Sequence, residues 1–175
     1  MSNTIGVFVD TSDVYHRVRR KFDGGKLCYD TYFEKVASWG TIQQAFAYGM
    51  QTDNEAAGFI TCLKIIGFDV RFKRPRILKI ADREIKRCDW GAQMSIDVVK
   101  TINRLNTVIL GISNPDYIPL IRWIKDQGVK VTILASCVPK SLRDIADSVI
   151  EITTDYLEDE DDFEEEDEED KEENE

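Results

Sequence analysis

The feature that most constrains the fold is the alternation of short apolar runs with segments of helix length. We expect strands at 4–10, 41–49, 69–74, 106–112, 129–135 and 150–152. Patterns typical of helices separate them, at 13–22, 30–39, 53–67, 89–105, 116–128 and 141–149. Strands joined through helices form right-handed crossovers and a mostly parallel sheet covered on both faces. We therefore predict a doubly wound α/β fold with three layers.

The charge of the chain is divided very unevenly. Residues 158–175 hold 15 acids and one lysine, so residues 1–157 carry the other 18 acids and 22 bases and have a net charge of +4. A block of like charges this long cannot collapse into a core. We predict one domain over 1–155 and a disordered acidic tail over 156–175. The tail could serve solubility alone, compete with a polyanion for the basic body, or contact a protein partner.

Composition excludes several classes of protein. The four cysteines are scattered and contain no C-x-x-C pair, and His16 is the only histidine, so neither a zinc knuckle nor a disulfide framework is indicated. No segment approaches the roughly 20 apolar residues of a membrane span. The N-terminus lacks the basic and apolar regions of a signal peptide. We expect a cytoplasmic protein that does not enter membranes.

Acidic and amide side chains follow two of the predicted strands. Asp10 ends the first strand, and Asn114 and Asp116 follow the strand at 106–112. In doubly wound sheets, functional groups gather beyond the carboxyl ends of the strands. If these two strands are neighbours, as in the common order 3-2-1-4-5, the three side chains meet at one edge. Carboxylates that lie close together repel each other unless a cation such as Mg²⁺ lies between them.

A third acid is expected from the helix before the 106–112 strand. Asp97 lies among Met94, Ile96 and Val98, where a charge without a partner would be costly. Asp89 is the other candidate, although Asp at the start of a helix is also a common cap. The same capping alternative holds for Asp13 and Asp116. We favour Asp97.

No other catalytic constellation competes with the acids. The chain has no G-x-S-x-G motif, and the turn after the first strand, DTSD, lacks the glycines of a phosphate-binding loop. Two hard cations held by carboxylates can activate water and stabilise the leaving oxygen of a phosphodiester. The acids therefore indicate metal-assisted hydrolysis.

Basic residues flank the acidic positions in the sequence. The segment 71–87 holds eight lysines and arginines, and the segment 16–22 reads HRVRRKF. Basic clusters beside an acidic pocket suit a nucleic-acid backbone. The alternative is a solvated helix face and edge strand. We expect RNA to contact Arg17, Arg19, Arg20, Arg74, Arg76 and Lys86. Aromatic side chains that could stack on bases are Tyr15, Phe22, Tyr29 and Phe72, although aromatics at these spacings are more often core.

The order of the motifs resembles the NYN domain family, the LabA-like branch of the PIN-like ribonucleases, over most of residues 4–152. The turn DTSD at 10–13 is similar to the family's D-G-S-N, and KRCD at 86–89 followed by Asp97 resembles a K-x-x-D motif and its helix acid. The family's S-G-D-S-D-F-x-P-L resembles SNPDYIPL at 113–120. LRDIADSVIEI at 142–152 is similar to the family's closing helix and strand.

The resemblance implies a PIN-like, Rossmann-like sandwich and a ribonuclease that depends on Mg²⁺ or Mn²⁺. Our hypothesis is an endoribonuclease with catalytic acids Asp10, Asp89, Asp97 and Asp116, metal ligands Asp10, Asp97 and Asp116, and substrate-positioning residues Ser12, Asp13 and Asn114. In the family an asparagine is usual at the position of Asp13 and an acid near that of Asn114. A second hypothesis is therefore open: a catalytically weakened regulatory module that binds RNA or a protein. A homo-oligomer also stays open. A phosphoacceptor receiver domain is disfavoured, because VKVTILASC carries no lysine at the end of its strand.

Overall fold

The structure, a computed structural model, describes residues 3–51, 56–80 and 83–159. Its centre is a six-stranded parallel sheet with the strand order β3-β2-β1-β6-β7-β8. The strands are β1 Thr4–Asp10, β2 Thr41–Met50, β3 Asp69–Lys73, β6 Thr107–Gly111, β7 Lys130–Ala135 and β8 Ser148–Glu151. The parallel α/β fold is confirmed, and β1 and β6 are neighbours as expected.

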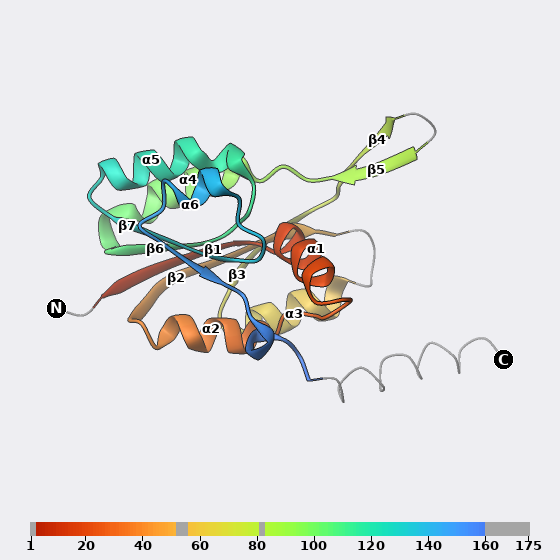
Figure 1. The fold of residues 1–175 in the computed structure, drawn as a ribbon, viewed down its shortest axis with the longest axis horizontal. Coiled ribbons are helices and arrows are strands. Elements are labelled where there is room, and N and C mark those ends of the chain that lie inside the picture. Colours follow the sequence, from red (N-terminus) through yellow and green to blue (C-terminus); the bar gives the residue numbers. More distant parts are fainter. Residues whose placement is uncertain (1–2, 52–55, 81–82, 160–175) are drawn as a thin grey trace.

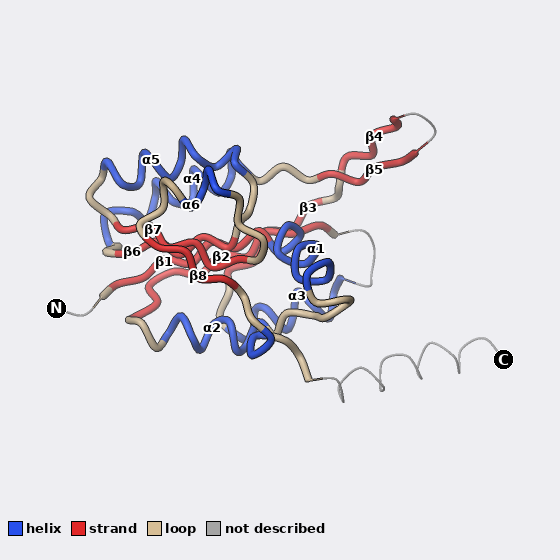
Figure 2. Tube along the Cα trace, in the orientation of Figure 1, coloured by secondary structure: helices blue, strands red, loops and turns tan. Residues whose placement is uncertain are grey.

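Helices cover both faces of the sheet, which Figure 2 shows between two helical layers. One face packs against α1 Thr11–Lys21, α2 Tyr29–Ala37 and α3 Ala56–Ile66. The other packs against α4 Gly91–Thr101, α5 Ile118–Asp126 and α6 Lys140–Arg143. Short 3-10 turns lie at Ile102–Arg104, Pro115–Tyr117 and Thr154–Tyr156. Strand order reverses between β1 and β6, and the carboxyl ends of strands at such a point are where folds of this kind usually bind ligands.

The core explains why β1 reads as an unbroken apolar run. Ile5, Val7 and Val9 point to the layer of α1, α2 and α3, whereas Phe8 points to the opposite layer. All four side chains are buried, and the Phe8 ring stacks on Phe46 of β2 at 5.4 Å between ring centroids. A strand covered on both faces needs apolar residues at every position, so the chain can place a charged residue only at its end, which is Asp10.

The last helix is shorter than expected. A helix was predicted over 141–149, but α6 ends at Arg143 and β8 already begins at Ser148. The reason is edge pairing: β8 pairs in parallel with β7, and the Asp147 side chain accepts a hydrogen bond from the Val131 backbone N–H at 2.8 Å. Tertiary pairing therefore overrides the helical pattern of this segment.

The basic segment between β3 and α4 forms a hairpin that was not predicted. Strands β4 Arg76–Ile80 and β5 Arg83–Arg87 pair antiparallel, and every side chain in them is exposed. In Figure 1 the hairpin projects away from the layered body, beyond the end of the sheet at which α1 starts. Its base is anchored because Lys73 donates a hydrogen bond to the Asp89 carbonyl and lies 4.1 Å from the Trp90 ring centroid.

The chain remains part of the body as far as the start of the predicted tail. Tyr156 is buried in the core, and Leu157 forms a β-bridge with Leu27. The rest of the predicted tail, residues 160–175, lies outside the described residues. None of the helices in the described ranges is long and apolar enough to cross a membrane.

Candidate active site at the carboxyl ends of β1 and β6

Asp10 connects the end of β1 to the start of α1. It is the N-cap of α1, and its Oδ1 accepts hydrogen bonds from the backbone N–H groups of Ser12 at 3.2 Å and Asp13 at 3.1 Å. The capping role that the sequence offered for Asp13 therefore belongs to Asp10. Its Oδ2 accepts no hydrogen bond from the described residues, so one carboxylate oxygen remains available to a ligand.

Asp13 joins α1 to the segment that follows β6. Its Oδ2 accepts a hydrogen bond from the Ser113 backbone N–H at 2.5 Å, and its Oδ1 pairs with Arg17 Nε at 3.3 Å. The Ser113 hydroxyl in turn donates to the Ser136 carbonyl beyond β7 at 2.9 Å. These bonds fix the β1 and β6 ends against each other. Both oxygens of Asp13 already have partners, which suits a positioning residue better than a metal ligand.

Asn114 and Asp116 form the second side of the site. The Asn114 side chain caps the 3-10 turn by accepting from the Asp116 backbone N–H at 3.0 Å, and its amide donates to Asp116 Oδ2 at 3.2 Å. Asp116 is exposed, while the next residue, Tyr117, is buried. The turn therefore presents Asp116 to solvent next to the capped end of β1.

Tyr117 is buried beside the site and lies within electrostatic reach of several acids. Burial raises the pKa of its hydroxyl well above the ordinary value, and the negative charges of Asp10, Asp89, Asp13 and Asp116 raise it further. Four carboxylates from three separate segments thus lie close enough to one tyrosine to affect its ionisation. Sequence reasoning had missed Tyr117 as a site residue, because a tyrosine in an apolar helix pattern carries no signal of this neighbourhood.

Asp89 is one of the acids whose charge acts on Tyr117. Asp89 is exposed just before α4, and its Oδ1 accepts from the Gly91 backbone N–H at 2.9 Å. Its charge raises the pKa of both Asp10 and Tyr117. The Lys73 bond to its carbonyl, at the base of the hairpin, holds it in this place.

Asp97 is buried among partner side chains from α4, β2 and β3. It is 4% exposed, and it accepts hydrogen bonds from the Tyr48 hydroxyl at 3.0 Å and the Gln93 side-chain amide at 3.1 Å. Arg71 lies 3.9 Å away. The partners that a charge at this position needs are therefore supplied by neighbouring side chains. Tyr48, the hydrogen-bond partner of Asp97, has its pKa raised by burial, by the Asp97 charge and also by Tyr117.

The electrostatics of Asp10 resemble those of a functional carboxylate. Burial raises its pKa from the ordinary 3.8 to about 6, and repulsion from Asp13 and Asp89 adds to the rise. Hydrogen bonds from the Asp13 and Ser12 backbone N–H groups oppose the rise without cancelling it. Metal sites and acid-base sites often contain a carboxylate whose pKa is raised by neighbouring carboxylates.

The donor set suits a hard divalent cation. Within the described ranges, no three Asp, Glu, His or Cys side chains lie close enough together to form a ready-made metal site. Mg²⁺ does not need one, because it usually binds one or two carboxylates and keeps several waters. The unbonded Oδ2 of Asp10 and the exposed carboxylates of Asp89 and Asp116 are oxygen donors of that kind. The residues therefore fit Mg²⁺ or Mn²⁺.

The predicted RNA-binding residues fall into two groups. In α1, Arg17 pairs with Asp13, Arg19 donates to the Tyr15 hydroxyl at 2.8 Å, and Arg20 is exposed. The second group lies in and beside the hairpin and consists of Arg74, Arg76 and Lys86. These three side chains are exposed and form no ion pair within the described part of the chain.

The comparisons agree with the sequence resemblance. The NYN domain family matches residues 4–155. No curated protein matches the chain. A crystal structure of a protein of unknown function from Vibrio parahaemolyticus RIMD 2210633 is similar in fold, with a TM-score of 0.78 and 24% sequence identity, over 90% of this chain and 97% of that chain.

At this identity the solved structure supports the fold alone, whereas the family match spans the sheet, both helical layers and every acid of the site. It begins at the first residue of β1 and ends within the last 3-10 turn. The chain is a member of the NYN domain family.

Proposed function

We propose that this protein is an endoribonuclease that depends on Mg²⁺ or Mn²⁺ and cleaves RNA at the carboxyl ends of β1 and β6. The NYN family belongs to the PIN-like nucleases, which supports this reaction class. The observation that carries the proposal is the pairing of β1 with β6, which places Asp10 and the segment that holds Asp116 at one edge of the sheet, where the Ser113 backbone N–H donates to Asp13. A phosphodiester could be held there between oxygen donors on two sides.

The acids have separate roles in this proposal. Asp10 and Asp116 hold the metal, and Asp89 either orients it or binds a second ion. A bound Mg²⁺ or Mn²⁺ would supply a water of lowered pKa and would stabilise charge on the phosphate oxygens. Asp13 and Asn114 position the substrate, with Ser12 beside them.

Asp97 is proposed to act indirectly. Its hydrogen bond to the Tyr48 hydroxyl fixes a buried ring that packs against Trp90 at 5.5 Å between centroids. Trp90 follows Asp89 directly, so this packing helps to hold Asp89 at the site. We assign Asp97 a positioning role and give its place among the direct ligands to Asp89.

The basic residues would bind the RNA backbone on either side of the acids. Arg20 lies on α1, which starts at Asp10, and the hairpin is joined to the site through Asp89. Phosphate contacts of this kind fix the position of the strand without reading its sequence. The exposed hairpin bases Arg76 and Lys86 are placed to extend the contact beyond the body of the domain.

The test is cleavage of a labelled RNA by the purified full-length protein. We expect cleavage with Mn²⁺ or Mg²⁺, none in EDTA, and a loss of at least about 100-fold in Asp10→Asn, as for loss of a single charge-stabilising group at an active site. The matched control is Asp126→Asn, an exposed acid at the end of α5, which should cleave like wild type. Equal cleavage by Asp10→Asn and wild type would refute the proposal.

A second function is favoured by one observation, the absence of three clustered ligand side chains in the described residues. On that alternative the domain binds RNA or a protein partner without cutting. Retained RNA affinity together with no cleavage in any divalent metal would select it.

A further inference from the structure

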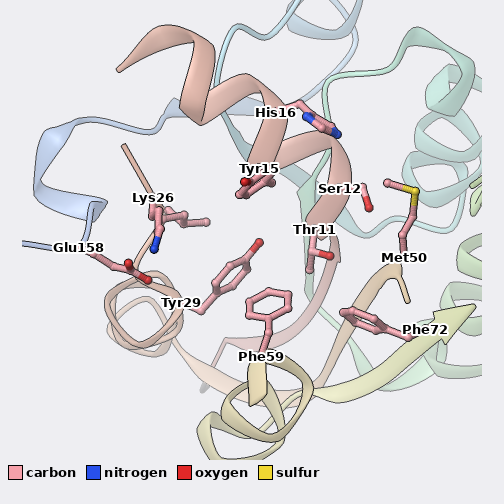
Figure 3. Close-up of a pocket in the computed structure, with 11 residues that line it drawn as sticks. Thr11, Ser12, Tyr15, His16, Lys26, Tyr29, Met50, Phe59, Phe72 and Glu158 are labelled. Carbon is pink, nitrogen blue, oxygen red and sulfur yellow. The ribbon is translucent and has the colours of Figure 1, made fainter. Parts of the chain in front are cut away.

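A cavity of about 320 Å³ lies directly beside the acidic site, and the proposed catalytic roles leave it unused. It lies between α1, α2, α3 and the ends of β2 and β3, is open to solvent on part of its surface, and is also lined by Lys26 and Glu158. Figure 3 shows its walls, which include four aromatic side chains, Tyr15, Tyr29, Phe59 and Phe72. These rings come from α1, α2, α3 and β3, so no periodic pattern in the sequence indicates the cavity.

The cavity and the acids share a wall. Thr11 and Ser12 line the cavity, and they follow Asp10 directly in the first turn of α1. The Tyr29 hydroxyl is close enough to Asp10 that the carboxylate, together with burial, raises the tyrosine pKa. A nucleotide whose phosphate reaches Asp10 would therefore have the cavity within reach of its base.

The aromatic rings at the cavity meet one another edge to face. Tyr29 meets Phe59 edge to face, with ring centroids 5.4 Å apart and planes at 62°, and Phe59 meets Phe72 at 6.0 Å and 62°. None of these pairs is stacked face to face. Tyr15 and Phe59 are also 43% and 39% exposed, which is a large apolar area to leave in water beside an active site.

Polar atoms at the cavity could recognise the edge of a base. The Tyr29 hydroxyl points into the cavity in Figure 3 and makes no hydrogen bond to the described residues. His16 lies at the rim and is exposed. A mainly apolar cavity with a few convergent polar groups is typical of a site for a small ring system, and its volume is near the lower end of the roughly 300–1,000 Å³ of such sites.

We propose that this cavity binds one unpaired nucleobase of a single-stranded RNA, turned out of its stack beside the phosphate at Asp10. The inference rests on the proposed ribonuclease function and narrows its substrate to RNA that is single-stranded at the cut. A base within a duplex is stacked and paired, and extracting it costs a few kcal/mol, whereas an unpaired base is free to enter. Every base can stack on aromatic side chains, so we expect the cavity to distinguish single-stranded from double-stranded RNA more strongly than one base from another.

The test is a binding measurement that needs no cleavage. The probe is a short single-stranded RNA that carries one 2-aminopurine, whose fluorescence is quenched by stacking, titrated with full-length protein in EDTA. We expect quenching with the single strand and none with the same strand annealed to its complement. In Phe59→Ala the Kd should rise about 5- to 150-fold, which is the usual effect of removing one stacking ring.

Two further variants sharpen the result. Tyr29→Phe keeps the ring and removes the hydroxyl, so we expect a smaller rise in Kd than in Phe59→Ala. Trp39→Ala is the matched control, because Trp39 is 36% exposed and borders the opposite end of the sheet, near Asn3 and Thr107. It should bind like wild type, and circular dichroism checks that all variants are folded.

The outcomes separate the cavity from the catalytic proposal. Wild-type Kd and quenching in both Phe59→Ala and Tyr29→Phe, or equal binding of the duplex, would overturn the base-binding assignment. Quenching that depends on Phe59, without cleavage of any RNA in Mn²⁺, would support the cavity while refuting the ribonuclease. Cleavage without quenching would do the reverse.

Discussion

Replacing Asp10 by asparagine should make the protein more stable while it strongly reduces cleavage. Asparagine keeps an Oδ1 that can accept the hydrogen bonds of the Ser12 and Asp13 backbone N–H groups, and it is as good an N-cap as aspartate. It removes the buried negative charge that lies beside Asp13 and Asp89. The side chain proposed to hold the metal is therefore also one that destabilises the fold.

The magnitude follows from the pKa. In the folded chain the pKa of Asp10 is about 6, against 3.8 in the ordinary state. As the pH rises from about 4 to about 6, the unfolded chain loses this proton before the folded chain does, so folding becomes less favourable. Above pH 6 the full cost is reached, on the order of 3 kcal/mol, because each pKa unit corresponds to about 1.4 kcal/mol. The variant does not bear this cost.

The assay is urea unfolding of wild type and Asp10→Asn in EDTA at several pH values. We expect nearly equal free energies of unfolding at pH 4, an advantage of the variant that grows to pH 6, and a plateau above. At pH 8 the variant should also melt about 6 to 12 °C higher, at about 2–4 °C per kcal/mol for a chain of this size. A variant that is less stable at pH 8, or an advantage that does not change with pH, would refute the reasoning.

Three further predictions concern stability and binding. Glu151→Gln should lose about 1–2 kcal/mol at pH 7 in urea unfolding, because Glu151 holds two cationic side chains and two backbone N–H groups. The pKa of Glu151 is lowered in the folded chain, so this loss should shrink as the pH falls below the pKa of a free glutamate and vanish below the lowered pKa. Gly49→Ala should cost about 1–3 kcal/mol, since a Cβ there would lie 2.5 Å from Phe72 Cζ; an unchanged melting temperature would contradict this. Replacing both Arg76 and Lys86 by alanine should lower the slope of log K against log salt for single-stranded RNA by about 1.4, as each lost phosphate contact removes about 0.7.

The layered fold was predictable because hydrophobic burial dictates it. The strand at 4–10 is apolar at every position between its ends, and only a sheet covered on both faces requires that. The expectation that Asp10 lies at the same edge as Asn114 and Asp116 depended on β1 and β6 being neighbours, and the structure pairs these two strands. This expectation required only the order of the strands and no knowledge of side-chain geometry.

The hairpin was missed because its residues bury nothing. RILKI and REIKR alternate weakly, and the charges in them indicated a solvated surface; a two-stranded ribbon has no core that would leave a stronger pattern. The base of that hairpin also holds Asp89, through the bond from Lys73 to its carbonyl, so the sequence could not show how Asp89 is positioned.

The hydrogen-bond partners of buried side chains could not be predicted from the sequence either. The hydrogen bond from Tyr48 to Asp97 joins residues 49 positions apart, and no local signal distinguishes a buried acid with such a partner from one that faces a cavity. The aromatic cavity is similar: Tyr15, Tyr29 and Phe72 were visible as candidates for stacking, but the cavity arises only where three helices meet.

The most direct test of a cation at these carboxylates is paramagnetic broadening in the full-length, ¹⁵N-labelled protein. Mn²⁺ is added below one equivalent, and amide signals are compared between wild type and Asp10→Asn. We predict loss of the signals of Ser12, Asp13 and Asp116 in wild type and their retention in the variant. Equal broadening of these signals in both proteins, or broadening confined to the acidic residues 158–175, would contradict a metal site at the ends of β1 and β6.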